Sequence, residues 1–242
     1  MHKALKKWAK YLLKLAPVPL TKNEQYDRLT ELIIKRVCTR DSLCIDVGAN
    51  EGKILAMFIR HCPAAVHFAF EPIPLLYKLL VRKFGSASRI YQVALSDNKG
   101  SIDYNVTESD MAYSGIKKRI DKDLNYFTVV VKSDLLDNII PSFAKISVVK
   151  IDVEGAEYHV LMGAERILHQ HKPFVLFEYG QGGSDAYNIS PQTMFSFFDE
   201  RGYQVNMLNS FLEKRQPLTV NHFAMHYRNR TEYFFIASPL VG

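Results

Sequence analysis

One short stretch, CIDVGANEG, places acidic side chains among glycines between Cys44 and Gly52. An apolar run ends there at Asp46, and glycines follow at positions 48 and 52. Glycine lets a backbone turn tightly and approach a ligand closely. Phosphate-binding loops share this feature, but the spacing here is not G-x-G-x-x-G, and Asp46 and Glu51 would repel a diphosphate. The stretch therefore favours a cationic cofactor without a phosphate. S-adenosylmethionine, which carries an ammonium and a sulfonium group, meets that requirement.

A second acid, Glu71, ends the next apolar run, VHFAFEP. An acid at this place can accept hydrogen bonds from both hydroxyls of a ribose. Enzymes that bind NAD share this signal, and a single acid at a strand end is often only a helix cap or a solvated charge. Together with the acid and the glycines of the first stretch, it is much more specific for a nucleoside cofactor.

A third group of acids lies in KIDVEGAE, which runs from Lys150 to Glu157. A strand is expected to end at Asp152 or Val153, beside the first strand, so Asp152 should face the same crevice. Glu178 ends the following strand and should lie next to Asp152. Such a pair could hold a divalent ion such as Mg²⁺, or one carboxylate could act as a general base. Glu154 is a further candidate base, although an acid there also suits the dipole of the helix that follows.

Alternating apolar runs and helical patterns must position these acids. The expected strands cover 43–48, 66–72, 89–95, 145–153, 173–180, 203–208 and 232–238, and the expected helices 51–61, 73–84, 155–169 and 191–201. This alternation predicts an α/β fold with a doubly wound, mostly parallel sheet that is covered on both faces. The last two strands show no helical pattern between them and are expected to form an antiparallel pair at one edge.

Residues 96–144 interrupt the alternation after the third strand. SIDYNV (101–106) and YFTVVVKS (126–133) predict an extra strand pair, and the polar segment between them predicts a surface loop or a substrate lid. No second independent domain is indicated, so residues 21–242 are expected to form one domain.

The charge of the chain is concentrated at its beginning. The 242 residues carry a formal net charge of +6, and residues 1–22 hold six lysines and no acid. The remainder is balanced, so the basic character does not predict nucleic-acid binding. Residues 1–20 predict a cationic amphipathic helix. That helix could pack on the domain, lie on anionic lipid as a peripheral membrane contact, or dock a partner.

The cysteines, Cys38, Cys44 and Cys62, show neither paired nor zinc-ligand spacing. An odd number without a framework predicts a reducing compartment, hence a cytoplasmic protein, and buried structural thiols.

Several of these stretches, taken in order, resemble the FkbM family of S-adenosylmethionine-dependent methyltransferases. They are CIDVGANEG, FAFEPIP, VALSDNKGSIDYNV, VVVKSDLLDNII, VVKIDVEGAEYHVLMGAERIL and FVLFEYG, and they span roughly residues 43–180. The resemblance implies the Rossmann-like, seven-stranded class I methyltransferase fold with its last strand inserted antiparallel. It also implies methyl transfer, usually to a hydroxyl oxygen of a sugar or secondary metabolite, and thus a small-molecule or glycan acceptor.

The resemblance also implies roles for individual residues. The methionine part of the cofactor is expected beside Asp46, Gly48, Asn50 and Gly52 of the first turn, and the ribose at Glu71. The adenine is expected beside Ala94 and Leu95 at the end of the third strand, and the methyl group closest to Asp152. The segment around Met111 to Lys118 departs from the family and leaves the acceptor open. An NAD-dependent oxidoreductase and a non-catalytic binding module with this fold are the alternatives.

Overall fold

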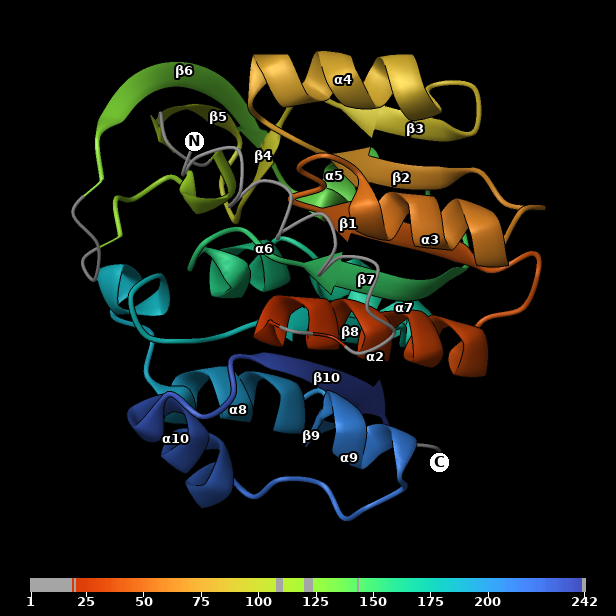
Figure 1. The fold of residues 1–242 in the computed structure, drawn as a ribbon, viewed down its shortest axis with the longest axis vertical. Coiled ribbons are helices and arrows are strands. Elements are labelled where there is room, and N and C mark those ends of the chain that lie inside the picture. The colour runs from red at the N-terminus through yellow and green to blue at the C-terminus, as the bar shows by residue number, and fades with distance from the viewer. Residues whose placement is uncertain (1–18, 20, 108–110, 120–123, 143, 241–242) are drawn as a thin grey trace, which may run out of the picture.

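A seven-stranded sheet forms the centre of the molecule (Figure 1). The computed structural model describes residues 19, 21–107, 111–119, 124–142 and 144–240. Along the sheet the order is β3-β2-β1-β7-β8-β10-β9, and every pairing is parallel except those of β10, which runs antiparallel to both neighbours. The strands are β1 Leu43–Val47, β2 His67–Phe70, β3 Ser88–Tyr91, β7 Ile146–Ile151, β8 Phe174–Glu178, β9 Tyr203–Met207 and β10 Phe234–Pro239. The predicted fold class is confirmed, including the inserted antiparallel last strand.

Helices cover both faces of this sheet (Figure 1). One face carries α2 Lys22–Val37, α3 Lys53–His61, α4 Pro74–Phe84 and α9 Leu208–Leu212. The other carries α5 Leu136–Ile139, α6 Glu157–Met162, α7 Glu165–His171, α8 Pro191–Asp199 and α10 Val220–Asn229. Because strand side chains alternate between faces, Ile45 and Val47 of β1 enter the second layer. Cys44 and Asp46 face the layer of α2 and α3.

A small second sheet holds the interruption after the third strand. Its order is β4-β6-β5, with β4 Ala94–Leu95, β5 Gly100–Thr107 and β6 Tyr126–Asp134. The predicted strand pair is therefore confirmed. The single strand predicted over 89–95 is wrong, because the chain leaves the main sheet after Tyr91 and enters the small sheet at Ala94.

The described part of the polar segment is docked on the small sheet. A short 3-10 helix, η1 Met111–Tyr113, is followed by backbone hydrogen bonds in both directions between Gly115 and Asn105. Met111 and Ile116 pack on the apolar residues of β5 and β6. Residues 111–119 thus pack as a wall on the small sheet, and a role as a substrate lid stays a prediction.

Two helical expectations are wrong. The helix predicted over 155–169 is two helices, because the Asp137 carboxylate accepts the N–H groups of Arg166 and Ile167 at 2.6 and 3.1 Å and starts α7 separately. Helices α9 and α10 lie between β9 and β10, where the sequence showed no helical pattern. The first has a single turn, and the second buries only Phe223 and Ala224, so neither leaves a clear periodicity.

Helix α2 was not foreseen, although its start carries a capping signal. The Thr21 hydroxyl accepts the N–H of Glu24 at 3.2 Å, and the Glu24 carboxylate accepts the N–H of Thr21 at 3.1 Å. This reciprocal pair is the capping box of the pattern T-x-x-E. Ile33 and Ile34 are fully buried on the sheet. The cationic helix predicted over residues 1–20 lies, except for Pro19, outside the described residues. None of the described helices is both long and apolar enough to cross a bilayer.

Replacing Thr21 by alanine should destabilise the protein through α2. The cap hydroxyl satisfies a backbone N–H that nothing in the helix can bond, and its loss costs about 1 kcal/mol in similar caps. We expect the free energy of unfolding, measured by urea titration, to fall by about that amount. Thr21→Ser keeps the oxygen and should stay near wild type. Equal losses in both variants would show that the cap does not stabilise α2.

Candidate functional site

A cleft of about 1280 Å³ opens beyond the carboxyl ends of the central strands. The turns after β1, β2, β7 and β8 form its floor, and α2, the segment 111–119 and the end of α10 contribute walls. Six residues predicted from the sequence line it: Gly48, Asn50, Glu71, Asp152, Glu154 and Glu178. Asp46, Gly52, Ala94 and Leu95 do not line it.

Glu71 ties the first two strand ends together. One carboxylate oxygen accepts the N–H of Asn50 at 2.8 Å, and the other accepts the N–H of Ile73 at 2.9 Å. The side chain is 4% exposed, and this burial raises its pKa to about 7 despite the two hydrogen bonds. Each carboxylate oxygen has a second lone pair, so both can still accept from hydroxyls of a ligand in the cleft.

Lys150 lies between two of the predicted acids. Its Nζ is 3.4 Å from Asp46 Oδ1 and 3.5 Å from Asp152 Oδ2, and it donates to the carbonyl oxygen of Gly48 at 2.9 Å. Lys150 and Asp46 are direct neighbours across β7 and β1. Burial by itself would lower the pKa of Lys150, but Asp152 and Asp46 outweigh it, so the pKa is raised and the lysine stays charged.

Asp46 therefore differs from the sequence interpretation, which placed its charge against the ligand. Its side chain is fully buried beneath the cleft floor, and burial raises its pKa while Lys150 counteracts this. Neither carboxylate oxygen has a hydrogen-bond partner among the described residues. Asp46 holds Lys150 from below, and it is Asp152 that meets the cleft. The sequence reasoning gave Lys150 no role, although a lysine inside an otherwise apolar strand was a signal.

Asp152 and Glu178 lie together, as predicted, and Glu154 joins them. Their carboxylate oxygens lie within 4.8 Å of one another. Burial raises the pKa of Glu178 well above its usual range, and repulsion from Asp152 and Glu154 adds to this. Burial would also raise the pKa of Asp152, but Lys150 and a hydrogen bond from Glu178 outweigh it and the pKa is lowered. The opposite shifts favour a proton on Glu178 and ionisation of Asp152.

Arg119 links this cluster to the wall formed by residues 111–119. Its Nη1 is 2.5 Å from Glu154 Oε2, and each side chain is 10% exposed. Glu154 adopts a left-handed backbone with φ of 57°, which is unfavourable for a residue with a side chain. Burial, then Asp152, raises the pKa of Glu154 to about 8, while Arg119 opposes the rise. The sequence reasoning missed Arg119, which lies in a segment that differs from the resembled family.

The two predicted glycines serve chain packing. Both have positive φ, 72° at Gly48 and 81° at Gly52. A Cβ on Gly48 would lie 1.9 Å from the carbonyl oxygen of Asp152, so its absence lets the two strand ends touch. A Cβ on Gly52 would lie 2.5 Å from the ring of Phe84 in α4. Only Gly48 approaches the cleft, and Gly52 makes room for a helix.

Ala94 and Leu95 line a separate, adjoining cavity of about 10 Å³. Their exposed fractions are 5% and 3%, and Gly48 and Phe70 contribute to the same small cavity. The predicted contact with an adenine stays a prediction for these two residues.

Comparison with known proteins shows which family the chain resembles. The family model described as the methyltransferase FkbM domain matches residues 46–205. A 2-O-methyltransferase, NoeI, from Sinorhizobium fredii is 27% identical over 155 residues, which are 57% of this chain and 63% of that protein. The solved structure of methyltransferase FkbM from Methylobacillus flagellatus KT aligns with a TM-score of 0.52 at 16% identity, over 83% of this chain and 44% of that one. The matches thus span less than two thirds of either protein's length, and the structural likeness concerns the fold.

Removing the charge of Lys150 should strongly destabilise the protein. Lys150→Met leaves Asp46 and Asp152 without a counter-charge, and breaking a buried ion pair typically costs about 3–5 kcal/mol. Adding Asp46→Asn should recover most of that loss. Lys99→Met, which removes an exposed ion pair with Asp134, should cost less than about 1 kcal/mol. Urea unfolding of these variants measures each value, and a Lys150→Met loss no larger than that of Lys99→Met would contradict the assignment.

Stability of the ligand-free protein should fall with rising pH because of Glu71. Its pKa is about 7 in the folded chain against an ordinary 4.5, so the folded state holds a proton that the unfolded state has released. The stabilisation is complete below about pH 4 and is lost as the pH rises through about 7. The decline between pH 5 and 8 should be smaller in Glu71→Gln by roughly 2–3 kcal/mol. Urea titrations over this range test it, and identical pH profiles would refute the raised pKa.

Proposed function

Because the chain belongs to the FkbM methyltransferase family, we propose that it binds S-adenosylmethionine in the cleft and methylates a hydroxyl oxygen of a small-molecule or glycan acceptor. The observation that carries this proposal is an excess of buried acid at the strand ends. Burial raises the pKa values of Glu71 and Glu178, and that of Glu154 although Arg119 opposes the rise. A cationic ligand supplies the missing charge, whereas a diphosphate would add to the repulsion.

Residues of the first two turns are proposed to hold the cofactor. Glu71 presents the free lone pairs of a fixed carboxylate to the ribose hydroxyls. Gly48 and Asn50 line the cleft between Glu71 and Asp152, on the side proposed for the methionine part. Asp46 acts indirectly, because it holds Lys150. When bound, the cofactor supplies an electrophilic methyl group on a positively charged sulfur.

Asp152 is the proposed general base. An alcohol is a weak nucleophile, so a nearby base that accepts its proton should speed its attack on a methyl carbon. The pKa of Asp152 is lowered and its side chain is 37% exposed, so it can reach an acceptor in the cleft. The raised pKa of Glu178 favours its protonated form, which can donate to Asp152, so we assign Glu178 as a positioning residue. Glu154 is paired with Arg119, so we assign it to holding the wall formed by residues 111–119 and not to accepting the proton of the acceptor.

A divalent ion fits this cluster less well than the sequence suggested. The three carboxyl groups have the oxygen donors that Mg²⁺ prefers. However, Lys150 already pairs with Asp152, Arg119 pairs with Glu154, and the raised pKa of Glu178 favours its neutral form. An ion would have to displace these partners, so we assign no step to a metal.

Aromatic and polar side chains on the outer wall suit a hydroxylated acceptor. The lining there includes Tyr26, Tyr113, Tyr227, Tyr233, Arg119 and Gln181. Flat aromatic faces pack on the apolar faces of a sugar ring, while amide and guanidinium groups bond its hydroxyls. The name of the relative, a 2-O-methyltransferase, is consistent with an oxygen acceptor.

Calorimetry and turnover should separate this proposal from its alternatives. We expect S-adenosylmethionine to bind and NAD not to bind. Glu71→Gln should weaken cofactor binding at least tenfold, since one backbone N–H and the ribose lose an acceptor. Asp152→Asn should keep cofactor binding within about threefold but lower the rate of S-adenosylhomocysteine formation, with oligosaccharides as acceptors, by about 100-fold or more.

Asp103→Asn provides the control and should change neither quantity, because Asp103 of β5 does not line the cleft. Binding of NAD alone would favour an oxidoreductase, and binding of neither ligand would favour a non-catalytic module. A fully active Asp152→Asn variant would remove the general base from the mechanism while leaving the cofactor assignment intact.

A further inference from the structure

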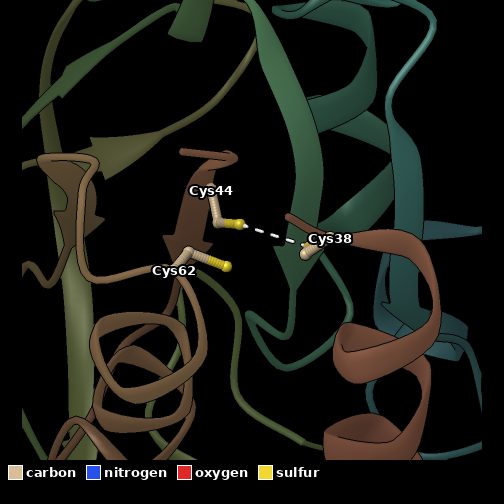
Figure 2. A group of neighbouring side chains, drawn as sticks. All are labelled: Cys38, Cys44 and Cys62. Atoms are coloured by element: carbon tan, nitrogen blue, oxygen red, sulfur yellow. Dashed lines mark hydrogen bonds between the residues drawn. The ribbon is translucent and has the colours of Figure 1, made fainter. Parts of the chain in front are cut away.

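The three cysteines converge at the end of β1 that lies opposite the cleft (Figure 2). Cys38 follows the last turn of α2, Cys44 lies in β1, and Cys62 follows the last turn of α3. Their sulfur atoms lie within 4.8 Å of one another, and the Sγ atoms of Cys38 and Cys44 are 3.9 Å apart. The sequence spacing gave no hint of this, because three separate elements bring the thiols together.

The spacing of the sulfurs matches ligands around a shared ion. A metal–sulfur bond of about 2.3 Å places the sulfurs of a trigonal site about 4 Å apart. A disulfide would need about 2.05 Å. The observed 3.9 Å between Cys38 and Cys44 is close to the first value and far from the second.

Surrounding groups hold the thiols in place. His67 is fully buried; its Nδ1 accepts the N–H of Cys44 at 3.2 Å, and its Nε2 is 3.1 Å from the carbonyl oxygen of Cys62. Both ring nitrogens are therefore occupied, so His67 orients the backbone of two cysteines instead of acting as a fourth ligand. Among the described residues, no other His, Cys, Asp or Glu joins the group of three.

The local electrostatics favour a cation over free thiolates. Two helices end at the cluster, and the carbonyl ends of helices attract positive charge. Cys38 is partly exposed, which gives an ion a way in.

We propose that Cys38, Cys44 and Cys62 form a three-thiolate site for a soft d¹⁰ cation, with Cu(I) as its best match. Soft thiolates select Cu(I), which accepts three sulfur ligands, whereas structural zinc takes four ligands and the described residues offer three. Binding forms three metal–sulfur bonds without any redox change. The protons of the three thiols pass to solvent as the bonds form. The site is independent of the proposed methyl transfer.

Titration with Cu(I) tests the site directly, because these are the chain's three cysteines. The full-length protein is reduced with a non-thiol reductant, freed of metal, and titrated with Cu(I) in competition with a chromogenic Cu(I) chelator. We expect one equivalent to be retained, a thiolate-to-copper absorption band in the ultraviolet, and protection of all three thiols from a thiol reagent. Zn²⁺ in a parallel titration should bind at least tenfold more weakly.

Cys38→Ser should weaken Cu(I) binding at least tenfold. The metal-free variant should unfold at the wild-type temperature, because the Cys38 side chain is partly exposed. Met57→Leu removes a thioether from the same apolar layer and should bind as wild type, as should Asp152→Asn in the other cluster. If Cys38→Ser does not fold, selective alkylation of Cys38 in the folded wild type should block binding instead. Loss of all Cu(I) to the chelator, binding unchanged without Cys38, or tighter binding of Zn²⁺ would overturn the proposal.

Discussion

The ion pair between Lys150 and the two aspartates is the interaction on which the cleft depends. Parallel pairing of β1 and β7 makes Asp46 and Lys150 direct neighbours, and Asp152 ends the same strand as the lysine. Without Lys150, two aspartates would meet at the end of the central strands with no positive charge between them. The lysine also donates to the carbonyl oxygen of Gly48, so the same group fixes the backbone of the first turn. One side chain, Lys150, therefore both offsets the charge of the aspartates and holds the first turn in place.

Lys150 pairs directly with the two aspartates, and the structure gives it no ion pair with the surrounding glutamates. Glu71 and Glu157 are buried near the strand ends and Glu154 and Glu178 are partly buried there, and loss of solvent raises the pKa of each. Glu154 pairs with Arg119, and the raised pKa values of the other three favour their neutral forms. Groups whose ionisation is suppressed in this way cluster at functional sites, because a ligand of the right charge can replace the protons. The ligand-free protein thus carries a cost that a cationic ligand would relieve, at the same strand ends where the fold places its crevice.

Much of this arrangement could be read from the sequence, and what could not depended on three-dimensional contacts. The alternating pattern predicted the parallel sheet, and the ends of its strands predicted that Asp152 and Glu178 would lie together. Lys150 was missed because its partners become visible only when the register of β1 against β7 is known. Arg119 was missed because its partner Glu154 lies on a distant segment. The position of Asp46 was misjudged because strand alternation, which turns it toward α2 and α3, was not followed to its consequence.

Helix α2 runs from the cleft to the thiol cluster, so its two ends lie at the two sites. Its first half contributes Tyr26 and Thr30 to the cleft wall, and Cys38 follows its last turn at the thiol cluster. A helix of 16 residues behaves as a stiff rod, about 24 Å long, so holding one end restrains the direction of the other. The hydrogen bond from Tyr26 to Glu232 already fixes the cleft end. An ion bound by the three thiols would fix the opposite end against β1 and α3. It would thereby stabilise a wall of the cleft without touching the reacting groups, which makes the thiol cluster a structural complement to the acidic site.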